Sequence, residues 1–311
     1  MKIVVYHKST NLEYQQSILK NLYNTLKDKG HNIVYWEEDS YYDADVAVIF
    51  GSWKKVKAPD DEELPENLKH HALKKEIIIQ QGMKPVVVIE TPLLKRKITD
   101  KHEQYRFGLN HYMNKLADFK NKNSKPDRFN KLNLEIKPWR KKTDNGHILI
   151  TCQNLNDASL FGINFSLWLS NTIKHLILRT KRKIIVRDHP ENKTSLKKLL
   201  NNFFIAHTDQ VEYQTSGDIK SALKNAHCTI SYTSGSSIDS ILEGVPVIPG
   251  SEYNFVWDIS SHSLDDVENP RCDKREQLLY DLAYAQWSVK EIENGTAWEH
   301  LFNEHSRSNN T

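Results

Sequence analysis

Short apolar segments alternate with amphipathic segments along most of this 311-residue chain, and no other feature limits its fold as strongly. Residues 2–7 and 46–50 have the composition of buried strands, and 12–29 gathers its large aliphatic side chains on one helical face before Gly30. In the first half we also expect strands at 31–36 and 85–90 and a helix at 68–81. A repeated strand–helix–strand order favours a parallel sheet covered by helices, so the pattern predicts an α/β protein.

The same order restarts after a polar, glycine-containing stretch at residues 141–146. Residues 93–139 show no clear period and predict long loops with short helices. We therefore expect two α/β domains, residues 1–145 and 146–311. The elements expected in the second are strands at 147–152, 183–187, 211–213, 229–232 and 245–248, helices at 168–180, 195–203, 216–225, 238–243 and 274–304, and a frayed end at 306–311.

Composition limits the class of protein. The formal net charge is +3, which is weak evidence for a nucleic-acid partner. The sequence contains no apolar run near the roughly 18 residues that span a bilayer, and residues 2–7 predict a strand where a signal peptide would stand. Three scattered cysteines do not suggest a disulfide framework or a zinc site. We expect a cytoplasmic protein with no stable membrane insertion.

A serine- and glycine-rich turn follows the strand expected at 229–232. It consists of Thr233, Ser234, Gly235, Ser236 and Ser237, and a short helix follows it. Backbone N–H groups and hydroxyls at the start of a helix favour an anion, typically phosphate. The alternative is an ordinary turn whose serines only cap the helix.

A second candidate lies at the end of the strand expected at 183–187, which breaks at Pro190. It brings Arg187 and His189 to the carboxyl end, where open α/β sheets bind their ligands. A guanidinium can hold phosphate with two hydrogen bonds, and an imidazole can protonate a departing phosphate oxygen. The alternative is a histidine that merely ends a strand.

The pair His189-Pro190 followed by the pair Ser236-Ser237 resembles the HP and SS motifs of bacterial sialyltransferases and capsule-type Kdo transferases. The segment 243–248 also resembles the pattern around the donor site of GT-B glycosyltransferases. This resemblance implies two Rossmann-like domains facing across a cleft, with a C-terminal helix crossing back to the first. It implies that the second domain binds the phosphate of a nucleotide sugar, CMP- or UDP-linked, as a substrate, with no separate cofactor.

Further candidates surround this predicted donor site. Gln153, Asp157 and Ser159 follow the strand at 147–152, although a plain polar loop explains them equally well. Ser234 and Gly235 complete the phosphate-binding turn. Glu243 could accept hydrogen bonds from ribose hydroxyls, or could lie on the helix surface.

Glu90 is the best-placed candidate for a catalytic base, because it ends an expected central strand of the first domain. Its alternative role is an ion pair with Lys95 or Arg96. Residues 89–96 occupy the place of the acidic motif of the resembled families but differ from it. The other candidates for this role are Arg106, Asn110, His111 and Asp100.

The sequence predicts no metal site. Asp43 and Asp45 precede a strand and so lie at its amino end, away from the expected ligand edge. His70 and His71 are adjacent on an expected helix, so their rings should point apart.

The predicted function is an inverting, metal-independent glycosyltransferase with catalytic residues Glu90 and His189 and a surface glycan as acceptor. Two alternatives stay open. One is a phage-type DNA glycosyltransferase acting on a hydroxymethylated base, which the lysine- and aromatic-rich stretch 95–142 permits. The other is a sugar-nucleotide epimerase-like enzyme of the same fold. A secreted binding protein is less consistent with the absence of a signal sequence. The oligomeric state is not predicted.

Overall fold

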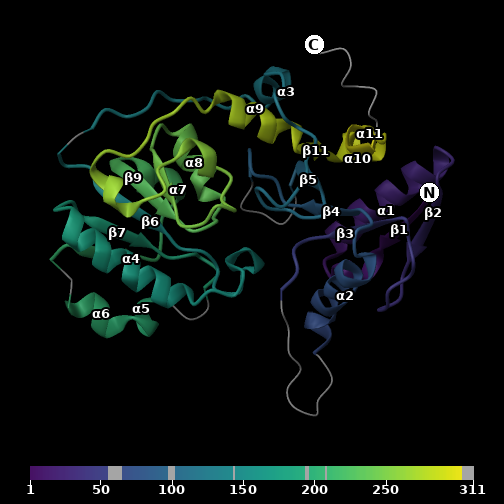
Figure 1. Cartoon of the computed structure of the whole chain (residues 1–311), viewed down its shortest axis with the longest axis horizontal. Coiled ribbons are helices and arrows are strands. Elements are labelled where there is room, and N and C mark those ends of the chain that lie inside the picture. The colour runs from purple at the N-terminus through teal and green to yellow at the C-terminus, as the bar shows by residue number, and fades with distance from the viewer. Residues whose placement is uncertain (55–64, 97–101, 143, 193–195, 207–208, 303–311) are drawn as a thin grey trace. The chain divides into compact units, whose positions relative to one another are not determined.

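A computed structural model describes residues 1–54, 65–96, 102–142, 144–192, 196–206 and 209–302 (Figure 1). The chain forms two compact units, each of which is a Rossmann-like α/β structure. The first unit comprises Met1–Leu132 with Tyr280–Thr311, and the second comprises Asn133–Leu279. The predicted α/β fold with two Rossmann-like domains is confirmed.

The first unit contains a six-stranded sheet in the order β11-β5-β4-β3-β1-β2. The parallel part consists of β1 (Lys2–Tyr6), β2 (Asn32–Trp36), β3 (Val46–Phe50) and β4 (Val86–Glu90). Two antiparallel pairings add β5 (Gln104–Leu109) and β11 (Gln286–Ser288). Its helices are η1 (His7–Ser9), α1 (Glu13–Asp28), α2 (Glu66–Gln81), α3 (Asp127–Lys131), α10 (Val289–Glu293) and α11 (Thr296–Phe302).

The C-terminal helices pack on the first unit. The apolar face of α1 shares a buried core with Ile292, Trp298 and the sheet. Two hydrogen bonds join α1 to α10: Asn21 Nδ2 donates to Glu293 Oε1 over 2.8 Å, and Thr25 Oγ1 donates to the Glu293 carbonyl over 2.6 Å. The prediction that the end of the chain returns to the first domain is therefore confirmed.

The second unit contains a five-stranded, wholly parallel sheet in the order β10-β9-β6-β7-β8. The strands are β6 (His147–Thr151), β7 (Ile184–Arg187), β8 (Val211–Gln214), β9 (Ala226–Ser231) and β10 (Val247–Pro249). The helices are η2 (Ala158–Leu160), α4 (Phe165–Arg179), α5 (Leu196–Leu199), α6 (Asn201–Ala206), α7 (Ile219–Leu223), α8 (Ser236–Leu242), η3 (Trp257–Ile259) and η4 (Leu264–Glu268), and α9 (Glu276–Tyr284) runs from this unit into the first. One sheet face packs on α4 and the other packs on α7 and Val245.

The sequence pattern missed two strands. β5 lies in the stretch that was predicted as loops. The sequence did not indicate a strand there, because Arg106 and Gly108 interrupt the apolar pattern. β11 interrupts the helix predicted over 274–304, and Ser288 begins α10 with a capping box to Glu291. The helix predicted at 195–203 is two short helices, and Ser195 and residues 303–311 lie outside the described residues.

Residues 133–142, which begin the second unit, hydrogen bond to the end of α8. The Lys137 amide donates to the Leu242 carbonyl and the Arg140 amide to the Gly244 carbonyl, each over 2.9 Å. Gly244 has a φ of +75°, and a Cβ there would lie 2.1 Å from the Pro138 carbonyl oxygen. Only glycine fits this close approach. The predicted division at residue 145 assigned residues 133–145 to the first domain and 280–311 to the second. The compact units place 133–145 in the second and 280–311 in the first.

Candidate functional site

Three strands of the second sheet end at the same level, and polar residues follow or complete each of them. Thr151 of β6 is in register with Arg187 of β7 and with Ser231 of β9. The turn predicted to bind phosphate begins two residues beyond Ser231. Parallel topology thus gathers the predicted donor residues at one edge of the sheet, where α/β proteins bind ligands.

Gln153 fixes the start of this turn. Its side chain is only 2% exposed. Oε1 accepts from the Thr233 amide over 2.7 Å, and Nε2 donates to Ser159 Oγ and Thr233 Oγ1, each over 3.0 Å. Because these bonds occupy the amide group, Gln153 orients the turn in this structure.

Ser234, Gly235 and Ser236 form the part of the turn that is available to a ligand. Ser236 Oγ donates to Thr151 Oγ1 over 2.8 Å and lies 3.0 Å from Ser234 Oγ. The amides of Ser234 and Gly235 have no acceptor within the described part of the chain. Three hydroxyls and two backbone N–H groups therefore lie together at the edge of the sheet. Such a cluster can bind an anion without a buried counter-charge.

Ser237 lies on the inner side of the turn. It has no exposed surface, and its Oγ accepts from Asn254 Nδ2 over 2.9 Å. Asn254, itself 1% exposed, also donates to the Tyr232 carbonyl over 3.1 Å. Asn254 was not predicted, because it is 17 residues from Ser237 and belongs to no recognisable pattern.

Asp188 organises the loop that carries His189. Its buried carboxylate accepts from the His189 amide over 2.8 Å, from Asn192 Nδ2 over 2.6 Å and from the Tyr213 hydroxyl. The Glu191 amide donates to His189 Nδ1 over 3.2 Å, which leaves the proton of a neutral ring on Nε2. The sequence signal for Asp188 was its position between Arg187 and His189.

Arg187 is partly buried beside this loop. Its Nη2 donates to the Gly217 carbonyl over 2.7 Å. Its Nε is buried with no acceptor among the described residues. The guanidinium is therefore held at the sheet edge with donor capacity left over.

Glu243 does not lie with the other predicted donor residues. It ends α8, whose seven residues begin at Ser236, so about 10 Å of helix separates it from the turn. Its Oε2 accepts from Lys137 Nζ over 2.6 Å.

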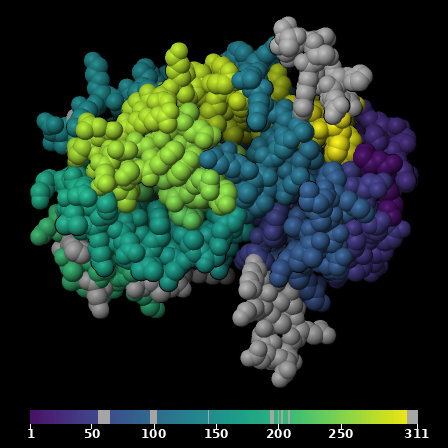
Figure 2. All heavy atoms as spheres, viewed as in Figure 1, coloured from purple at the N-terminus to yellow at the C-terminus, as the bar shows by residue number. Residues whose placement is uncertain are grey.

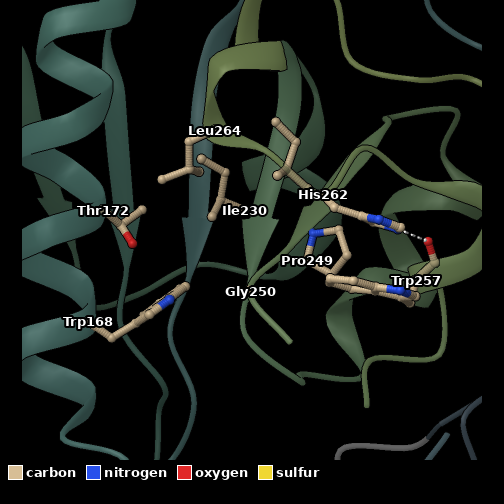
Figure 3. Close-up of a pocket in the computed structure, with 9 residues that line it drawn as sticks. Trp168, Thr172, Ile230, Pro249, Gly250, Trp257, His262 and Leu264 are labelled. Atoms are coloured by element: carbon tan, nitrogen blue, oxygen red, sulfur yellow. Dashed lines mark hydrogen bonds between the residues drawn. The ribbon is translucent and has the colours of Figure 1, made fainter. Parts of the chain in front are cut away.

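A separate aromatic cavity of about 210 Å³ lies on the α4 face of the second sheet (Figure 3). Trp168 and Thr172 of α4 form one side, and Trp257 and His262, whose rings stack 3.7 Å apart, form another. The wall nearest the sheet includes Gly250, where a Cβ would lie 2.8 Å from the Trp168 ring. No predicted site residue lines this cavity.

In the first unit, Glu90 ends β4 and is held by backbone N–H groups. Its Oε2 accepts from the Ser52 amide over 3.0 Å, and its Oε1 accepts from the Thr91 amide over 2.8 Å. Lys95 lies 3.9 Å from Glu103. The two amides leave acceptor positions on the Glu90 carboxylate for a substrate hydroxyl.

Lys74 is an unpredicted cation near Glu90. It is 3% exposed, and its Nζ donates to the Phe50 carbonyl over 3.2 Å. Burial lowers the pKa of Lys74 to about 7, and the Glu90 carboxylate opposes that shift. Its position on the apolar face of α2 was the only sequence signal.

The prediction that His70 and His71 point apart is wrong. Their ring centroids are 4.1 Å apart, because flexible χ angles bring neighbouring rings together over the same turn. Each ring has a buried Nδ1 with no partner among the described residues. Burial, followed by the charge of Lys74, lowers the pKa of His70 to about 4 and that of His71 to about 3.

The alternative candidates of the first unit have mostly structural contacts. Arg106 is 6% exposed and donates to the carbonyls of Thr91 and Tyr112 over 2.7 Å each. Asn110 accepts from the Val86 amide. Burial lowers the pKa of His111 to about 4, and its ring lies 5.0 Å from that of Trp53. Asp100 lies outside the described residues.

Asp43 and Asp45 lie at the amino end of β3, as predicted. Asp43 Oδ1 accepts from Lys84 Nζ over 2.7 Å, and Asp45 Oδ2 accepts from the Lys2 amide over 2.6 Å. Among the described residues, no three His, Cys, Asp or Glu side chains form a group that could hold a metal ion. None of the described helices is long and apolar enough to cross a membrane.

Two Rossmann-like units in one chain are the arrangement of the GT-B fold. The KpsC beta Kdo 2,7 transferase of Thermosulfurimonas dismutans aligns with a TM-score of 0.50 and 12% identity over 97% of this chain and 99% of that chain. The KpsC beta Kdo 2,4 transferase of the same organism gives 0.47 and 11% over 96% and 98%. A putative UDP-N-acetylglucosamine 2-epimerase from Listeria monocytogenes gives 0.33 and 10%, with 97% of each chain covered.

No family model and no curated protein sequence matches this chain. At 12% identity, the alignment with the 2,7 transferase establishes likeness of fold. The chemistry therefore has to be argued from the residues themselves.

Proposed function

We propose that this chain is a glycosyltransferase that moves a sugar from a CMP- or UDP-linked donor to an acceptor hydroxyl. One observation carries the proposal: hydroxyls of Thr151, Ser234 and Ser236 and two backbone N–H groups gather at the carboxyl edge of a parallel sheet. Preorganised neutral donors at such an edge suit the phosphate of a nucleotide. The GT-B likeness of the fold supports this reading.

The proposed donor site uses each predicted residue in a distinct way. Ser234, Gly235 and Ser236 bind the phosphate, and Arg187 balances its charge. His189 donates from Nε2 to the departing phosphate oxygen. Gln153 and Ser237 hold the turn in shape through Thr233 and Asn254.

We propose Glu90 as the base that takes the proton of the acceptor hydroxyl. Its carboxylate is fixed by two backbone N–H groups and is only partly buried. As the hydroxyl loses this proton to Glu90, its oxygen attacks the anomeric carbon, and the bond from that carbon to the donor phosphate oxygen breaks on the opposite face, so this single displacement inverts the carbon. We propose a surface glycan as the acceptor.

The test is a thermal-shift and calorimetric screen of the full chain against CMP, UDP, GDP and dTDP. A ligand at 100 times its Kd stabilises the folded state by about 2.7 kcal/mol. We expect stabilisation by CMP or UDP, and expect Ser236→Ala to reduce it while the exposed control Ser17→Ala does not. Failure of all four nucleotides to bind would overturn the proposal.

Product analysis separates transfer from epimerisation. A transferase releases the nucleotide when a donor reacts with an acceptor or with water. An epimerase-like enzyme would instead invert a sugar carbon while the nucleotide stays attached. Detection of an epimerised nucleotide sugar would replace the proposed activity but keep the proposed phosphate site.

A further inference from the structure

Lys74 has an unusual environment for a lysine. It belongs to α2, which forms part of the surface of the first unit (blue in Figures 1 and 2), yet its side chain points inward and is 3% exposed. The one acceptor recorded for its Nζ in the described residues is the Phe50 carbonyl, 3.2 Å away. An ammonium has three donors, so this bond satisfies one of the three within the described residues.

The turn after β3 connects Lys74 to Glu90. The Phe50 carbonyl accepts from Lys74, and two residues later the Ser52 amide donates to Glu90 Oε2 over 3.0 Å. Gly51 has a φ of +79°, and a Cβ there would lie 3.4 Å from Lys74 Nζ. The amine and the carboxylate therefore bind the two ends of one three-residue turn.

Four titratable side chains surround Lys74: those of Glu90, Lys54, His70 and His71. Glu90 on β4 favours its ammonium form, and Lys54, which follows β3, disfavours it. His70 and His71 precede it on α2, and burial keeps both imidazoles neutral near pH 7. The pKa of Lys74 is lowered to about 7, chiefly by burial.

The neighbouring η1 adds no free charge to this set. His7 Nδ1 lies 2.6 Å from the Tyr35 hydroxyl, and Lys8 Nζ lies 3.1 Å from Asp39. Ser9 contributes a neutral hydroxyl, which accepts from the Phe50 amide over 3.0 Å. Glu90 is thus the carboxylate that acts on Lys74.

Packing alone does not explain a lysine at this position. A methionine has a similar length and would fill the same space without the cost of burying an amine. What methionine would lack is the hydrogen bond to the Phe50 carbonyl and the charge beside Glu90.

We propose that Lys74 is a positioning residue for Glu90: it donates to the Phe50 carbonyl and so fixes the Phe50–Ser52 turn, whose Ser52 amide holds the carboxylate. The inference deepens the proposed role of Glu90 and rests on it. Lys74 itself does not touch substrate in this arrangement, because its amine lies beneath the turn.

The experiment follows the Ser52 amide resonance of isotope-labelled full-length protein by NMR between pH 5 and 9, without any substrate. We expect a step near pH 7 that disappears in Lys74→Met and persists in Lys75→Met, an exposed lysine on the same helix. The same step in Lys74→Met, or no step in the parent, would overturn the proposal.

A second arm keeps the test valid if Lys74→Met does not fold. The Cε resonance of Lys74 is titrated in the parent and in Glu90→Gln. Because the Glu90 carboxylate favours the ammonium form of Lys74, its removal should lower the lysine pKa by about one unit. An unchanged titration of Lys74 would contradict the coupling. Neither arm uses a nucleotide, so failure here is distinct from failure of the proposed function.

Discussion

The carboxyl edge of the second sheet consists of hydroxyls and amides that hydrogen bond to one another, whereas the corresponding edge of the first sheet contains a buried amine, a carboxylate and two imidazoles. Burial lowers the pKa of Lys74 at the first edge to about 7. The difference between the edges is the basis of the proposed division of labour, in which one edge binds a phosphate and the other takes a proton.

The same comparison explains how each edge is held. In the second unit, Gln153 and Asn254 are buried neutral amides whose hydrogen bonds fix the turn. In the first unit, the Phe50–Ser52 turn lies between groups of opposite charge, Lys74 and Glu90. Substitutions at the two edges should therefore affect different measurements.

The largest effect is expected from Glu90→Gln. Removal of a general base costs roughly 10²–10⁴-fold in rate, and donor affinity should stay nearly constant because the proposed phosphate site belongs to the second unit. Turnover is measured as nucleotide release with the donor found in the screen, and Glu13→Gln, an exposed change on α1, is the control. Near-normal turnover of Glu90→Gln would move the role of base to another group, with His111 the next candidate.

The next effect concerns stability. The pKa of Lys74 is about 7 in the folded state and 10.5 for the ordinary group, so the unfolded chain binds more protons between these values. The free energy of unfolding should therefore rise with pH, by up to about 1.4 kcal/mol per pH unit between pH 7 and 10 from this group. It should fall again as the pH is lowered through the same range.

Urea denaturation at several pH values measures this slope. Lys74→Met should lose the Lys74 contribution, and Lys75→Met should keep it. Parallel pH curves for parent and Lys74→Met would show that Lys74 is not buried as an amine.

At the second edge, His189→Ala and Ser236→Ala should each weaken nucleotide binding. A hydrogen bond to a charged phosphate is worth about 1.5–3 kcal/mol, which corresponds to roughly a ten- to hundredfold increase in Kd by calorimetry. His175→Ala, on the exposed side of α4, is the matched control for His189.

Ser237→Ala sharpens this prediction. Because the Ser237 hydroxyl is buried against Asn254, its loss should lower the free energy of unfolding by about 1 kcal/mol. A loss of nucleotide affinity as large as that of Ser236→Ala, with stability unchanged, would place Ser237 in contact with the ligand instead.

The smallest expected effect is that of chelation. Arg187, His189 and the backbone N–H groups of the turn can balance the departing phosphate, so EDTA should leave turnover unchanged. Loss of turnover in EDTA with recovery in manganese would show that a divalent ion accompanies the donor phosphates.

Much of the fold could be predicted from sequence, because β1, β3 and β6 are buried apolar runs whose period is local. β5 and β11 could not, since both are short and β11 pairs with β5 from the far end of the chain: the Gln104–Gln286 hydrogen bond between them joins residues 182 apart in sequence. Pairing at that separation leaves no local pattern.

For the candidate site too, some features could be predicted from sequence and others could not. The sequence by itself determined that Arg187, His189 and the turn from Thr233 to Ser237 follow parallel strands, and strand direction alone brings them to one edge. Only the tertiary structure decided which of these side chains are buried and which stay at the edge. It placed Ser237 inward against Asn254, Glu243 at the far end of α8, and the Lys74 amine under the turn that holds Glu90, because burial and hydrogen-bond partners depend on neighbours distant in sequence.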